Sequence, residues 1–303
     1  MTRQTVGHLL QSCVMALTHH GGDALLSMGL PKALIDAASA GPITVERGDR
    51  FALSRGLAVV PVRGLLTPNM FMFERYMGWA TYQGIEETMA ELAADTDCRA
   101  AVLDMDSPGG MVRGIEGAAE AIAALAAVKP VHVLVNPLSA SAAYWLASQG
   151  TDITVTPGAE LGCIGTRLVK SSPQKTDNWG DLWFEVSSSN ARAKNPNPAT
   201  EVGMAELQRM LDESEARFHA AVAAGRGIDP AALAQQLSVT DDPQDGGAVF
   251  PATEAITRGL ADGLETREAF YGRLTEAYAP PAPRTQSRAF AARAAAAQAM
   301  SAT

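Results

Sequence analysis

The chain has 303 residues, of which 47% are hydrophobic and 19% charged, enough to bury the core of one large α/β domain or two small ones. The 33 Asp and Glu outnumber the 24 Lys and Arg, and no basic stripe is apparent, which argues against a nucleic-acid-binding protein. Cys13, Cys98 and Cys163 are isolated, so neither a zinc site nor a disulfide framework is predicted. We therefore expect a reducing compartment and no metal or cofactor.

No apolar run approaches the roughly 18 residues of a membrane-spanning helix, and we expect a cytoplasmic chain without a membrane anchor. Residues 1–50 are predicted to form a helical arm and linker, because apolar residues recur at helical spacing over 25–40. Residues 51–278 are expected to form one domain. Residues 279–303 are rich in Pro, Ala and Arg, which predicts a flexible tail.

Within the central domain, short apolar segments alternate with helical patterns. Strands are predicted at 57–62, 100–105, 131–135, 153–155 and 183–186, and helices at 85–94, 115–125, from 141, from 198 to a stop at Gly225, and at 255–264. Largely apolar strands separated by helices predict an α/β fold, with a mostly parallel sheet covered by helices on both faces.

A serine opens the helix predicted from residue 141. Ser141 follows the loop 136–140 and precedes Ala142-Ala143, so its hydroxyl would lie near the positive end of a helix. The neighbouring alanines leave room for a substrate carbonyl, which suits a nucleophile in acyl transfer. The alternative is a helix-capping serine among packing alanines, which explains an isolated Ser-Ala-Ala equally well.

Two glycines end the strand at 100–105, in the sequence Ser107-Pro108-Gly109-Gly110. Glycine adopts backbone angles closed to other residues, so Gly109 and Gly110 can present N–H groups to a developing oxyanion. A simple tight turn is the alternative.

The base is harder to identify, because no histidine lies between Ser141 and His219, and His132 sits inside an apolar strand. The lysines after Ser141 are Lys170, Lys175 and Lys194, and only the last has no acidic residue in its surroundings, 187–197. A lysine acts as a base when neutral, which requires its pKa to fall from about 10.4 to roughly 7–8 by burial. Lys194 is therefore the predicted base. An exposed loop lysine is the alternative.

These segments together resemble the S49 peptidase family, which includes signal peptide peptidase A and phage capsid proteases. The resemblance spans about residues 57–272 and rests on five segments: 104–110, 139–147, Leu161-Gly162-Cys163-Ile164-Gly165, the Lys194 segment and Gly259-Leu260-Ala261-Asp262. It implies a ClpP/crotonase-like superhelix of ββα units. It also implies that Ser141 is the nucleophile and Lys194 the base, with an oxyanion hole from the N–H groups of Gly110 and Ala142 beside Gly109.

The sequence departs from this family at two places in the site. Ala142-Ala143 follows Ser141 where the family often has Gly-Gly, as in some phage-type members. Cys163 stands where a serine normally helps to orient the lysine, and a thiol is a weaker hydrogen-bonding group than a hydroxyl. Cys163 is therefore expected to support the Ser141–Lys194 dyad less well than a serine would.

Three alternative functions are consistent with this interpretation of the sequence. The first is a phage or prophage head-maturation protease that acts on scaffold, portal or capsid proteins in the host cytoplasm or procapsid, as a homo-oligomeric ring without nucleic acid or membrane. The second is a crotonase-like acyl-CoA enzyme with a carboxylate base, and the third is a structural head protein whose site is impaired.

Overall fold

The computed structural model describes residues 5–10, 13–32, 50–170 and 187–279. The predicted strand at 183–186, Lys175, the second half of the helix predicted over 25–40 and nearly all of the predicted tail lie outside these ranges.

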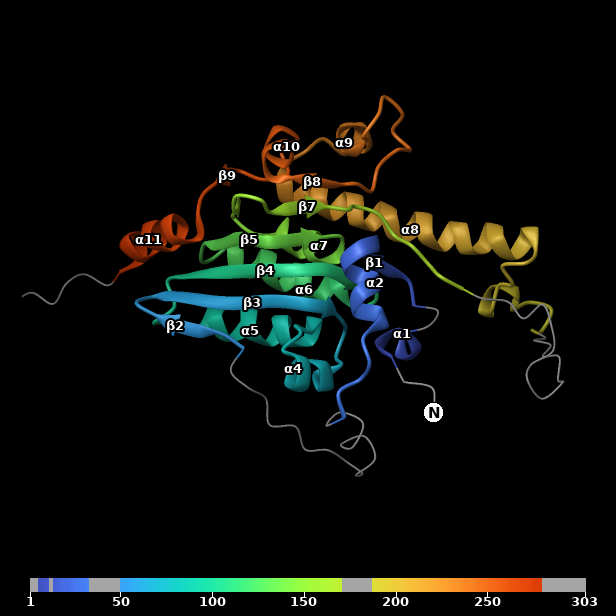
Figure 1. The fold of residues 1–303 in the computed structure, drawn as a ribbon, viewed down its shortest axis with the longest axis horizontal. Helices are drawn as coiled ribbons and strands as arrows, with labels where there is room; N and C mark the ends of the chain where they lie inside the picture. The colour runs from blue at the N-terminus through green and yellow to red at the C-terminus, as the bar shows by residue number, and fades with distance from the viewer. Residues whose placement is uncertain (1–4, 11–12, 33–49, 171–186, 280–303) are drawn as a thin grey trace, which may run out of the picture.

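The described residues form a mixed α/β structure around one sheet of nine strands, with the order β2-β3-β4-β5-β6-β9 along its main path (Figure 1). The central pairings β3–β4, β4–β5 and β5–β6 are parallel, which confirms the predicted fold class. The strands are β1 (Met15–Leu17), β2 (Ala52–Ser54), β3 (Leu57–Leu66), β4 (Ala100–Met111), β5 (Val131–Ala140), β6 (Asp152–Val155), β7 (Glu160–Gly162), β8 (Val249–Pro251) and β9 (Gly263–Leu264).

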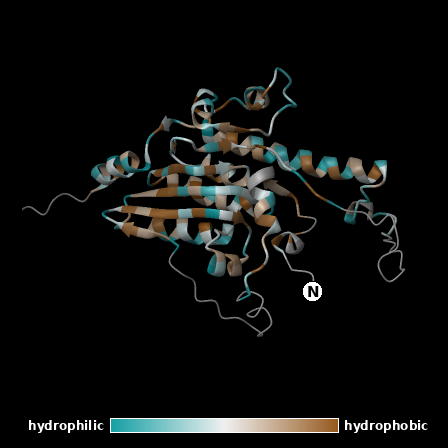
Figure 2. Ribbon diagram, in the orientation of Figure 1, coloured by the Kyte–Doolittle hydropathy of each residue, from teal (hydrophilic) through white to brown (hydrophobic). Residues whose placement is uncertain are grey.

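Helices cover both faces of the sheet. They are α1 (Val6–Leu9), α2 (His19–Ser27), α4 (Phe71–Met77), α5 (Tyr82–Ala94), α6 (Ile115–Ala126), α7 (Ala142–Ala147), α8 (Glu201–Arg226), α9 (Pro230–Leu237), α10 (Ala252–Thr257) and α11 (Arg267–Tyr278). Side chains alternate across β4, so Ala101 and Leu103 face the main core. Val102, on the other face, packs against Phe270 and Leu274 of α11. The central strands are hydrophobic along most of their length for this reason (Figure 2).

The N-terminal arm is more than a helical appendage, which corrects the sequence-based expectation. Between α1 and α2 it contributes β1, which pairs antiparallel with the end of β4. Met15 and Leu17 belong to a small hydrophobic cluster that also contains Phe73 and Trp79, separate from the main core. A three-residue strand has no periodicity of its own, so the open edge of β4 determines its conformation.

Helix α8 begins at Glu201, three residues after the predicted start, because the Thr200 side chain rather than Asn197 caps it by accepting a hydrogen bond from the Gly203 N–H at 3.1 Å. It continues past Gly225 to Gly227, which adopts the left-handed conformation of a helix end. Its N-terminal half projects beyond the sheet (Figure 1). No helix in the described parts of the chain is long and apolar enough to cross a membrane.

The C-terminal half of α8 covers the helix that follows Ser141. The ring of Phe218 stacks on Trp145 of α7 with centroids 4.6 Å apart and an interplanar angle of 15°, and both rings are almost fully buried. This contact holds α7 between the sheet and α8.

We expect Phe218→Ala to lower the free energy of unfolding by about 3–5 kcal/mol, because it removes a buried ring and leaves a cavity under α7. Urea denaturation followed by circular dichroism measures the change. Val202→Ala on the same helix is the matched control, because Val202 is 66% exposed and should change stability little. Equal stability of the two variants would contradict the role of the stacked pair.

Candidate active site

Ser141 joins the end of β5 to the start of α7 in a backbone conformation that non-glycine residues rarely adopt. Its φ is 56° and its ψ −121°, a geometry that costs on the order of 1–3 kcal/mol. The Ser141 N–H donates to the Gly162 carbonyl at 2.7 Å, and the Ser141 carbonyl accepts from the Trp145 N–H at 3.0 Å. The serine is therefore fixed from both sides.

The Ser141 hydroxyl does not cap α7, which argues against the capping alternative. It is fully buried and has no hydrogen-bond partner among the described residues. Ala140, Ala142 and Ala143 around it are also fully buried. A buried hydroxyl without a partner normally costs about 1–3 kcal/mol, and such groups concentrate at functional sites.

Gly109 brings the end of β4 into contact with Ser141. It has a φ of 109°, and a Cβ atom at this position would lie 3.0 Å from the Ser141 Cβ and 3.0 Å from the Ala140 carbonyl oxygen. A Cβ at Gly110 would lie 2.0 Å from the carbonyl oxygen of Leu66. Both glycines are therefore required by close backbone approach and, in the case of Gly109, by its positive φ.

The three predicted oxyanion donors differ in their surroundings. The Gly109 N–H donates to the Ser107 hydroxyl at 3.2 Å, and that hydroxyl donates to the Gly64 carbonyl at 2.6 Å. The Gly109 N–H is therefore already engaged in a hydrogen bond. The lack of a side chain at Gly109 allows the end of β4 to approach Ser141. Ala142 is the first residue of α7, and the first N–H groups of a helix have no intrahelical acceptor. Gly110 follows Gly109 on β4.

Cys163 lies beside Ser141 in a second strained stretch of backbone. Its φ is 55°, and its N–H donates to the Ala248 carbonyl at 2.6 Å. Burial raises the pKa of the Cys163 thiol, while the nearby Ser141 hydroxyl and Arg167 partly offset this increase. The thiol and the hydroxyl are thus neighbours without a well-formed hydrogen bond between them.

The structure does not bring Lys194 to Ser141 within one chain. Lys194 lies in the 3-10 helix η1 (Arg192–Lys194), and its side chain is exposed. The segment that precedes α8 lies at the outer end of that helix, away from α7 (Figure 1). Lys170 supports this segment, because its ammonium donates to the Asn195 side chain at 2.5 Å and to the Pro196 carbonyl at 2.7 Å. The burial that a neutral lysine requires is not present around Lys194.

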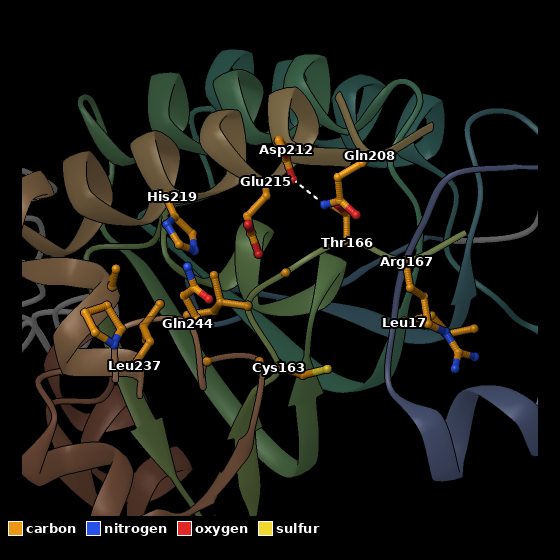
Figure 3. Close-up of a pocket in the computed structure, with 16 residues that line it drawn as sticks. Leu17, Cys163, Thr166, Arg167, Gln208, Asp212, Glu215, His219, Leu237 and Gln244 are labelled. Atoms are coloured by element: carbon orange, nitrogen blue, oxygen red, sulfur yellow. Dashed lines mark hydrogen bonds between the residues drawn. The ribbon is translucent and has the colours of Figure 1, made fainter. Parts of the chain in front are cut away.

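A cavity of about 780 Å³ opens next to Cys163 (Figure 3). Asp212, Glu215 and His219 of α8 point into it from the side opposite Cys163. Burial lowers the pKa of His219, and the nearby Glu215 carboxylate opposes this effect. The sequence analysis did not predict that these α8 residues line a cavity. The signal available for this was the polar face of the long amphipathic helix. Among the described residues no three His, Cys, Asp or Glu side chains gather to hold a metal ion.

Comparisons with known proteins bear on this site. Residues 123–279 match the family model described as Peptidase family S49. The chain is 30% identical over 247 residues to the capsid assembly protease C of Escherichia phage lambda, covering 80% of this chain and 54% of that protein. It is 30% identical over 217 residues to the head-tail preconnector protein GP5 of Enterobacteria phage P21, covering 71% of this chain and 42% of that protein. The chain thus spans about half the length of these curated relatives.

Similarity to solved structures is weaker. A single-site mutant of the 1510-N membrane-bound stomatin-specific protease aligns with a TM-score of 0.41 and 14% identity, over 73% of this chain and 85% of that chain. An enoyl-CoA hydratase/isomerase family member aligns with a TM-score of 0.39 and 20% identity, over 75% of this chain and 73% of that chain.

We expect Cys163 to be alkylated by iodoacetamide more slowly in the folded protein than in urea, because its raised pKa reduces the reactive thiolate at a given pH. The rate should increase as the pH rises. Peptide-resolved mass spectrometry separates Cys163 from Cys13 and Cys98. A Cys163 rate in the folded protein equal to that in urea would contradict this environment.

Proposed function

Since the chain belongs to peptidase family S49, we propose that it is a serine endopeptidase in which Ser141 is the nucleophile. The observation that carries this proposal is the strained backbone of Ser141, which holds a buried hydroxyl without a partner against Gly109. Strain of this kind at a nucleophile fixes the reacting atom before the substrate binds.

The proposed reaction is acyl transfer in two steps. Oγ of Ser141 attacks the carbonyl carbon of the scissile peptide bond and its proton passes to the base, which then protonates the leaving amine. Water hydrolyses the resulting ester in the second step. The N–H groups of Gly110 and Ala142 are the proposed donors to the oxyanion, while Gly109 allows the substrate carbonyl to approach.

Lys194 is the proposed base, acting on Ser141 in an assembled homo-oligomer. In the single chain Lys194 is exposed, and it belongs to the segment before α8, which lies at the outer end of that helix. Packing of a second copy against this end would bury Lys194 and place it near the Ser141 of its neighbour. Burial of that kind favours the neutral amine that a general base requires. Cys163 beside Ser141 is a weaker partner for the amine than a serine would be.

The proposed substrates are phage head proteins such as scaffold, portal or capsid proteins, in the host cytoplasm or the assembling procapsid. The 30% identity to a capsid assembly protease and to a head-tail preconnector protein supports this substrate class. The 780 Å³ cavity beside Cys163 offers space for a substrate side chain.

A structural head protein with an impaired site is the second candidate. This candidate is favoured by the exposure of Lys194 and by the position of its segment at the outer end of α8, away from α7. The two candidates make opposite predictions for the variants described next.

We expect Ser141→Ala to reduce casein cleavage by at least about 1,000-fold and to abolish labelling by a fluorophosphonate probe. Lys194→Ala and Lys194→Arg should both lose about 100-fold or more, because an arginine keeps the charge but cannot accept the proton. Full activity of Lys194→Arg would show that Lys194 contributes only its positive charge and does not act as the base. Cleavage retained by Ser141→Ala would exclude the mechanism, and a wild type without labelling or cleavage would favour the structural candidate.

Mixing the two inactive variants tests whether the dyad forms between copies. If Lys194 acts on the Ser141 of a neighbour, co-assembled Ser141→Ala and Lys194→Ala chains recover cleavage, because some interfaces pair an intact serine with an intact lysine. Native mass spectrometry should show that the mixed assemblies form. Mixed assemblies without activity would rule out a dyad shared between copies.

A further inference from the structure

The segment Val14–Thr18 of the N-terminal arm runs as an extended strand directly beside Ser141. Figure 1 shows β1 at the end of β4 next to α7, with which it is in contact. We propose that this segment occupies, from within the same chain, the position in which an extended protein substrate binds, and that it must leave before cleavage. The proposal rests on the proposed peptidase function and adds a regulation to it.

Two backbone edges hold the segment, one on each side. On the β4 side, the Thr18 N–H donates to the Pro108 carbonyl at 2.9 Å and the Val112 N–H donates to the Val14 carbonyl at 3.0 Å. On the opposite side, Met15 exchanges two hydrogen bonds with Arg167, of 3.0 and 2.8 Å. Without β1 both edges would present unpaired N–H and C=O groups. Edges of this kind accept an extended peptide as an added strand.

The register places the segment against the nucleophile. Leu17 pairs with Gly109 and Ala16 with Gly110, the two glycines of the candidate site. A Cβ atom at Gly109 would lie 2.2 Å from the Ala16 carbonyl oxygen and 3.0 Å from the Ser141 Cβ. The Ala16 carbonyl and the Ser141 side chain therefore meet at the space that Gly109 leaves free.

The path of the chain after β1 explains how the segment can occupy the site without being a substrate. Thr18 is the N-cap of α2, so the backbone turns into a helix instead of continuing as a strand past Ser141. The Gly22 N–H donates to the Thr18 carbonyl at 3.2 Å and fixes this turn. A protein substrate would have to continue extended to present its scissile bond.

One buried polar group weakens the binding of the Val14–Thr18 segment. The Thr18 hydroxyl is buried without a hydrogen-bond partner among the described residues, a state that opposes burial. Met15 and Leu17 pack in the small cluster with Phe73 and Trp79, and the segment contributes to the main core only the methyl group of Ala16 and the partly buried Val14. The segment can therefore open locally while the core stays folded.

Thr18→Pro and Thr18→Val form a matched pair that tests the proposal in the full chain. Both remove the unpartnered hydroxyl, and only proline also removes the N–H that donates to Pro108. Proline fits the backbone, because Thr18 has a φ of −64° and precedes a helix. We expect Thr18→Pro to cleave casein about five-fold faster than Thr18→Val, the factor that one hydrogen bond contributes. Equal rates would overturn the proposal.

A reversible cross-link tests the opposite direction. Met15 and Met111 are directly opposite in the β1–β4 pair, between the hydrogen-bonded residues, where the Cα atoms are close enough for a disulfide. In a Cys13→Ser background, oxidised Met15→Cys/Met111→Cys should lose casein cleavage and regain it on reduction. The reduced form is its own control for the lost methionines. Equal activity of both forms would show that β1 can stay in place.

Hydrogen exchange separates this proposal from the proposed function, because it needs no catalysis. The amides of Val112 and Arg167 donate to carbonyls of the Val14–Thr18 segment and should exchange about 100-fold faster than amides in the middle of β4, such as Leu103. Exchange as slow as that of Leu103 would mean that β1 opens only with the core, and the proposal would fail. A chain with fast exchange but no labelling of Ser141 would contradict the peptidase function alone.

Discussion

The hydrogen bond from the Ser141 N–H to the Gly162 carbonyl joins two strained stretches of backbone. Ser141 on one side and Gly162-Cys163 on the other all have positive φ, and β5 and β7 pair in parallel up to this point. The end of β4 completes the arrangement, because Gly109 has no side chain to separate it from Ser141. Three strand ends therefore converge on one hydroxyl, and the packed core around α7 stabilises a geometry that an isolated turn would not adopt.

The alternation of apolar strands and helices was sufficient to predict the α/β class, because burial on both faces makes a parallel strand apolar throughout. The approach of the Gly109-Gly110 pair to Ser141 was also predictable, since the glycines lie at the end of β4 and Ser141 follows the neighbouring parallel strand β5. Whether Lys194 is buried or exposed could not be predicted, because its burial depends on what packs against the outer end of α8. The role of β1 escaped prediction as well, since its partners Gly109–Met111 and Arg167 lie far away in the sequence.

The strand position and the cavity beside Cys163 are parts of one continuous region. Leu17, which pairs with Gly109, also lines the cavity together with Cys163 and Arg167. The same short segment therefore occupies the backbone edge at the nucleophile and forms part of the wall of the space proposed for a substrate side chain (Figure 3). Displacement of this segment would free the backbone edge at Ser141 and open the wall of the cavity at the same time.

The cluster that holds β1 gives the protein a built-in optical probe. Trp79 is nearly buried in that cluster with Met15 and Leu17, and its ring lies 5.2 Å from that of Phe73. Trp145, by contrast, is covered by Phe218 in the main core. Indole emission shifts to longer wavelength when water reaches the ring. With Trp179 and Trp183 replaced by phenylalanine, Trp79 would report on the arm and Trp145 on the packing of α8 against α7. Movement of the arm and movement of α8 could then be followed separately, in variants that each keep one of these two tryptophans.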